Sequence, residues 1–172
     1  VNLAGIGIAR ANHRASIHDF EANVNQLIRD IQVAYWHLYH SKANVDANEN
    51  FVTEARVTWQ KEVSKRGLGA SSLPQVAQAR EQYERFRQEL ARSRRRCLTA
   101  ERTLKQLLGM PGATEFRVIP DQKPLTDFVD VHWEAALSEA LVNRPEIASQ
   151  RESIRTAEID YEKATNGLCP DV

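Results

Sequence analysis

A seven-residue repeat of apolar side chains runs through residues 20–59, FEANVNQLIRDIQVAYWHLYHSKANVDANENFVTEARVTW. One column of the repeat is apolar over six heptads, and the other becomes small or polar midway. A 3.5-residue spacing is typical of a coiled-coil seam with a left-handed supercoil. The first column is Val24, Ile31, Leu38, Val45, Val52 and Trp59, and the second is Phe20, Leu27, Ala34, Ser41, Asn48 and Ala55.

The repeat predicts one long helix that begins near Ser16 and ends at Gly67. Ser16 can accept a hydrogen bond from the free amides of a first turn, and Asp19 three residues later suits the positive end of the helix dipole. No breaker interrupts the pattern before Gly67. About 50 residues at 1.5 Å each would make a helix of roughly 75 Å, far longer than an ordinary globular helix.

The long pattern breaks at residues 67–74, GLGASSLP. Two glycines favour the end of a helix, because glycine accepts the left-handed conformation that follows a last turn. Ser72 with Gln75 resembles a capping box, and Pro74 would lie in the first turn, where its missing N–H does no harm. These residues predict a turn, followed by the start of a second helix.

The second helix is expected to end at Gly109, with Pro111 beyond it. Its two columns contain only apolar or small side chains, so the two helices should pair as an antiparallel hairpin. The columns are Val76, Tyr83, Leu90, Cys97 and Leu104, and Ala79, Phe86, Ser93, Ala100 and Leu107.

The rest of the chain predicts a loop and two shorter helices. Residues 110–132 contain three prolines and no steady period. Residues 133–142 read as a short amphipathic helix, and Pro145 opens a last helix that ends near Gly167 and Pro170. We expect that last helix to pack on the base of the first through one apolar face, which consists of Ile147, Ile154, Ala157, Tyr161 and Ala164.

The composition supports an all-α fold and excludes several classes of function. The chain has 172 residues, with 23 basic and 23 acidic side chains, so no net charge draws it to nucleic acid. Glycine and proline are scarce, at 7 and 6 residues, which favours long helices. No apolar run approaches the roughly 20 residues of a membrane helix. Two cysteines allow at most one disulfide.

The sequence offers little for catalysis, and we expect neither an enzyme nor a bound cofactor or metal. His37 and His40 lie on one helix face, but a metal site would need further ligands. Cys97 occupies a seam position, where a small buried hydrophobe is the favoured reading. The cluster Arg92, Arg94, Arg95 and Arg96 should spread over a solvated helix surface.

Several stretches of the chain resemble the outer-membrane efflux protein (TolC-like) family, and they occur in the family's order. They match the helix leaving the barrel, the periplasmic tip, the returning helix and its end, the opening of the second repeat, and the approach to the next membrane strand. The stretches are 34–39 AYWHLY, 67–68 GL, 79–83 AREQY, 104–111 LKQLLGMP, 134–147 EAALSEALVNRPEI, and 164–166 ATN followed by Leu168 and Pro170.

This resemblance implies a homotrimeric outer-membrane channel, continued into the periplasm by a helical tunnel, with use in efflux or type I secretion. A periplasmic adaptor protein and an inner-membrane pump would dock at the tip, and substrates would pass through unchanged. The chain would lie on the periplasmic side without spanning the membrane. Its parts would be a barrel-proximal stub at 1–15, the hairpin at 16–109 with its tip at 67–74, a loop at 110–132, and a short helix with the start of the second-repeat helix at 133–172.

The tip is the candidate contact site for the adaptor. Where the family often carries an acid just after the tip, this chain has serines, and Cys169 replaces a leucine before the final proline. Alternatives are a periplasmic adaptor hairpin, another coiled-coil scaffold, or a helical-bundle metalloenzyme that would retain metal on purification. The expected contact residues are Gly67, Leu68, Gly69, Ala70, Ser71, Ser72, Leu73, Pro74, Gln75 and Val76.

Overall fold

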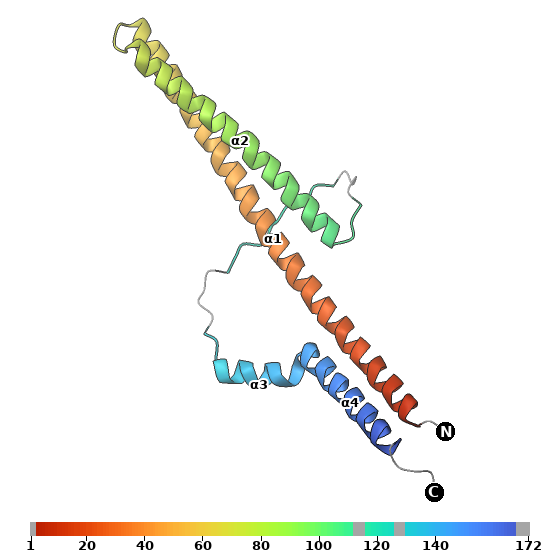
Figure 1. The fold of residues 1–172 in the computed structure, drawn as a ribbon. Helices are drawn as coiled ribbons and strands as arrows, with labels where there is room; N and C mark the ends of the chain where they lie inside the picture. The colour runs from red at the N-terminus through yellow and green to blue at the C-terminus, as the bar shows by residue number, and fades with distance from the viewer. Residues whose placement is uncertain (1–2, 112–115, 126–129, 168–172) are drawn as a thin grey trace. The chain divides into compact units, whose positions relative to one another are not determined.

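The computed structural model describes residues 3–111, 116–125 and 130–167. These residues form four helices and no strand, which confirms the all-α class (Figure 1). They fall into two compact units, one of residues 30–123 and the other of the remaining ends of the chain. The helices are α1 (Leu3–Gly67), α2 (Leu73–Leu107), α3 (Trp133–Asn143) and α4 (Pro145–Asn166).

The unit of residues 30–123 is the expected antiparallel hairpin, in which α1 and α2 lie side by side up to their connecting turn (Figure 1). All expected seam residues from Ile31 to Trp59 on α1, and all of those on α2, are buried or half-buried. Leu38 is 1% exposed and forms the core with Ala34 and Leu104. The heptad pattern therefore predicted the packed faces of this unit correctly.

The start of the first helix differs from the prediction. α1 begins at Leu3, and the expected cap residue Ser16 lies inside it, with its hydroxyl donating to the carbonyl of Asn12 at 3.0 Å. A bond to the carbonyl four residues back is the arrangement of a serine within a helix and not at its N-cap. Residues 3–15, which the resemblance assigns to a barrel-proximal stub, are likewise helical and belong to α1.

In the second unit, α4 runs antiparallel to the first part of α1. The two helices approach closely because α1 presents small side chains there: Ala11 is 1% exposed, and a Cβ atom on Gly7 would lie 3.2 Å from Ile159 Cδ1. Polar contacts join the same faces, where the Ser149 hydroxyl donates to Asp19 at 2.6 Å.

The expected packing face of α4 is wrong. Ile154, Ala157, Tyr161 and Ala164 are exposed, and only Ile147 is half-buried. The face of α4 that packs against α1 is instead largely polar, and the side chains of α1 that contact it are small or polar. That face holds Ser149, Glu152, Thr156 and Ile159.

The remaining elements complete this unit. α3 has no buried residue, and α4 ends at Asn166, followed by its C-cap Gly167, whose amide donates to the carbonyl of Lys163 at 3.1 Å. The expected breaker Pro170 and the substituted Cys169 lie outside the described residues. None of the described helices combines the length and the apolar character that a membrane crossing requires.

Candidate functional site at the hairpin tip

The first half of the tip is a glycine-terminated helix end. The amide of Ala70 donates to the carbonyl of Lys65 at 2.8 Å, and the amide of Gly69 donates to that of Arg66 at 3.0 Å. This pair of bonds is the Schellman motif, which requires a left-handed residue after the helix. Gly69 supplies it with φ of 74°, while Gly67 is the last helical residue of α1. Of the two glycines, only Gly69 therefore adopts a backbone conformation that favours glycine.

The second half of the tip starts α2. Ser72 is the N-cap, and its backbone amide donates to the Gln75 side chain at 2.8 Å within a capping box. Pro74 lies in the first turn, as expected. The Oγ atom of Ser71 also lies 3.1 Å from Oε1 of Gln75. Both serines of the turn are thus hydrogen-bonded to side chains of the hairpin.

Glu62 is a further residue of the tip that the sequence does not predict. Its carboxylate accepts hydrogen bonds from Lys65 at 2.6 Å and from the Ser71 hydroxyl at 2.8 Å, which ties the end of α1 to the turn. The hydrogen bonds from Lys65 and Ser71 lower the pKa of Glu62 below its ordinary value. The i,i+3 spacing of Glu62 and Lys65 was the only signal in the sequence, and it does not reveal the serine.

The structure brings all ten expected contact residues together at this end of the hairpin. Ser71 and Val76 are half-buried, and the other eight residues are exposed. Leu68 is 86% exposed, and Leu73 is also exposed on the other side of the turn. The tip therefore presents two leucines among small side chains to solvent.

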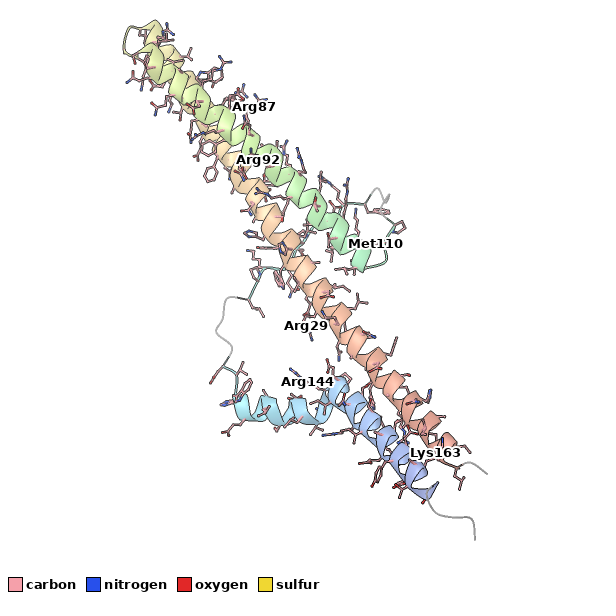
Figure 2. All side chains as sticks on the ribbon, viewed as in Figure 1. Arg29, Arg87, Arg92, Met110, Arg144 and Lys163 are labelled. Atoms are coloured by element: carbon pink, nitrogen blue, oxygen red, sulfur yellow. The ribbon has the colours of Figure 1, made fainter. Side chains whose placement is uncertain are left out.

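Aromatic stacking supports the helices behind the tip. Trp59 and Tyr83 stack across the seam with their ring centroids 5.5 Å apart, and so do Phe51 and Phe86. Arg87, labelled in Figure 2, lies over Tyr83 at 5.6 Å from the ring centroid. Such pairs add to the energy of apolar burial, so the tip rests on well-packed helices.

Away from the tip, segment 116–122 packs on the hairpin through a buried ion pair. Lys105 donates to the carbonyl of Phe116 at 2.5 Å, and Glu101 accepts from the amide of Val118 at 3.1 Å. Burial raises the pKa of Glu101, but the hydrogen bonds from Lys105 and Val118 outweigh burial and leave this pKa below its ordinary value. The sequence predicts only a loop for this segment.

The histidine pair, Cys97 and the arginine cluster lie on the helices behind the tip, at surface or seam positions. His40 Nε2 lies 3.0 Å from Asn44 Nδ2, and the described residues contain no group of three ligands suited to a metal. Cys97 is half-buried and packs against the core. Among the clustered arginines, Arg92 and Arg96 pair with Glu89, and Arg94 pairs with Glu49.

A family model described as outer membrane efflux protein matches residues 1–110, which is more than half of the 172 residues and includes the whole hairpin. No curated protein and no solved structure matches the chain.

Proposed function

The chain belongs to the outer membrane efflux protein family, and from this premise we propose that it forms the periplasmic helical part of an efflux duct. The family match supports a transport role at the outer membrane and not an enzymatic one. In the proposed assembly three copies surround the conduit, and substrates pass through without chemical change. An adaptor protein and an inner-membrane pump complete the export system.

The hairpin tip is the proposed docking site for the adaptor. The observation that carries this proposal is the exposure of Leu68 and Leu73 on a turn whose two serine hydroxyls are already hydrogen-bonded within the hairpin. A partner that covers these leucines gains apolar burial without breaking bonds within the turn. The small side chains of Gly69 and Ala70 between them allow a partner helix to approach closely.

The family match also distinguishes the proposed function from its main alternative. An adaptor hairpin would share the two long antiparallel helices, so the fold alone does not separate the two classes. The matching model describes the outer-membrane component, and its match runs through α1, the tip and α2. The observation therefore favours the channel over the adaptor and over an unrelated scaffold.

The docking proposal is tested in cells that make the efflux protein. Leu68→Glu places a charge at the most exposed apolar side chain of the tip, where no packing is lost. We expect loss of crosslinking between the tip and the adaptor, and increased sensitivity to a panel of toxic compounds. The amount of protein in the outer membrane should stay unchanged.

Val57→Glu is the matched control, because Val57 is a half-exposed apolar residue of the same hairpin outside the tip. It should preserve both crosslinking and export. If Leu68→Glu leaves crosslinking and export intact, the tip is an ordinary turn and the docking assignment is wrong.

A further inference from the structure

A groove of about 710 Å³ lies along one face of the hairpin unit, between α1 and α2. Its apolar lining comes from Val33 and Ala34 on α1 and from Ala100 and Leu107 on α2. A volume of this size is within the range of small-molecule binding sites in proteins. The groove lies entirely within the unit of residues 30–123, away from the tip residues.

The groove brings together two features that are separate in the sequence. His37 and His40 line it from α1, and Arg95 and Arg96 line it from α2. Among the described residues of the lining, Asp30 is the only acidic one. Arg96 is paired with Glu89 outside the groove, whereas Arg95 has no ion pair within the described part of the chain. The groove therefore carries a guanidinium whose donors are available to a ligand.

Two polar side chains of the lining, Thr99 and Thr103, are hydrogen-bonded to the backbone of α2. Their hydroxyls donate to backbone carbonyls of their own helix, so they offer no proton to a ligand. The remaining donors of the lining include the guanidinium of Arg95 and the imidazole of His37, while Nε2 of His40 lies 3.0 Å from Nδ2 of Asn44, which also lines the groove. These groups lie beside an apolar floor.

We propose that this groove binds a small organic anion with an apolar body, such as an aryl sulfonate or carboxylate. The apolar part would cover Val33 and Leu107, and the anionic group would meet Arg95. A charge-assisted hydrogen bond from a guanidinium is stronger than a neutral one and gives preference for the anion. The proposal depends on the groove alone, so it stands or fails independently of adaptor docking at the tip.

The test compares two probes with the same ring system on the 172-residue chain. 1-Anilinonaphthalene-8-sulfonate carries a negative charge, and N-phenyl-1-naphthylamine lacks it. We expect tighter binding of the sulfonate, measured by equilibrium dialysis, with weaker binding at high salt because the charge is partly screened. In nuclear magnetic resonance spectra the sulfonate should shift the imidazole signals of His37 and His40 but not those of the other three histidines.

Matched arginine variants locate the anionic group. Arg95→Gln should weaken sulfonate binding on the order of 3–10-fold, as expected for an exposed charged hydrogen bond, without affecting the neutral probe. Arg94→Gln removes the same charge from the same helix but lines a different cavity, and it should change neither. Equal affinity for both probes, unmoved His37 and His40 signals, or equal effects of the two variants would each overturn the proposal.

Discussion

The Nζ atom of Lys105 lies 2.8 Å from Oε1 of Glu101, in an ion pair whose side chains are 8% and 10% exposed. Burying two charges costs free energy unless their remaining hydrogen-bonding groups are satisfied. Here the backbone of segment 116–122 satisfies them, through the carbonyl of Phe116 and the amide of Val118. The ion pair therefore binds this segment to the hairpin through hydrogen bonds.

Removing the buried ammonium should destabilise the hairpin unit. Lys105→Met leaves the Glu101 carboxylate buried without its charged partner, and we expect a loss of about 3 kcal/mol in the free energy of unfolding. Lys42→Met breaks an exposed pair with Asp46 at the same i,i+4 spacing and should cost about 0.5 kcal/mol or less. Urea unfolding followed by circular dichroism measures both. Equal effects of the two variants would contradict the role of the buried pair.

The lowered pKa of Glu101 predicts that stability depends on pH. The unfolded chain binds the proton more readily than the folded chain, so the carboxylate contributes stability above its ordinary pKa of 4.5. This contribution is lost as the pH falls through the folded pKa. Glu101→Gln should therefore be clearly less stable than the natural chain at pH 7, with a smaller difference at pH 3. A difference that stays constant between these pH values would refute the prediction.

The two tip glycines should respond differently to alanine. Gly69→Ala forces a Cβ into a left-handed conformation and should cost about 1 kcal/mol, although nothing lies within 4 Å of the added atom. Gly67→Ala lies in the last turn of α1, in open space, and should be neutral or stabilising by several tenths of a kcal/mol. Thermal unfolding compares the two variants. A destabilising Gly67→Ala would show that the glycine assignment is reversed.

Two leucines from the same heptad repeat should also differ. Leu38→Ala removes a side chain that is 1% exposed and should cost about 2–5 kcal/mol. Leu27→Ala alters a side chain that is 44% exposed and should cost less than about 1 kcal/mol in the isolated chain. Chemical unfolding of the two variants gives the comparison. If Leu27→Ala is as costly as Leu38→Ala, the seam continues further toward the start of α1 than the structure shows.

The hairpin could be predicted because its signals are local and repeated. Heptad columns identified the faces that pack between Ile31 and Trp59, and serine, proline and glycine marked the turn. The repeat did not reveal that Phe20, Val24 and Leu27 would be exposed, since apolar periodicity identifies a face but not its partner.

The sequence contains weaker signals for the unit in which α4 packs on the first part of α1. The start of α1 was missed because a serine preceding an acid is found at helix starts and also inside helices. The contact between α1 and α4 depends on small and polar side chains such as Ala11 and Ser149, which leave no apolar stripe to count. The packing of segment 116–122 could not be predicted, because the segment binds through its own backbone groups. The side chains that bind those groups lie at a distance along the chain.

At the tip, the sequence predicted the turn and its cap but not the conformation of each glycine. Gly69 and Ala70 are both small tip residues at which a bulky substitution would obstruct a docking partner. The left-handed backbone of Gly69 makes that position unsuitable, because strain there would be confused with loss of docking. Leu68 is the better position for a docking test, since its side chain is exposed and its backbone is not left-handed.

The attachment of segment 116–122 also bears on the order in which the hairpin folds. Pairs near the turn, such as Trp59 with Tyr83, enclose a short stretch of chain and lose little entropy on meeting, whereas pairs further away enclose more. Zippering would therefore start at the turn and reach Ala34 and Leu104 last. The Tyr35 hydroxyl, which accepts from the amide of Gln122 at 3.0 Å, lies at that late end. The returning chain thus closes the end of the hairpin that would otherwise fray first.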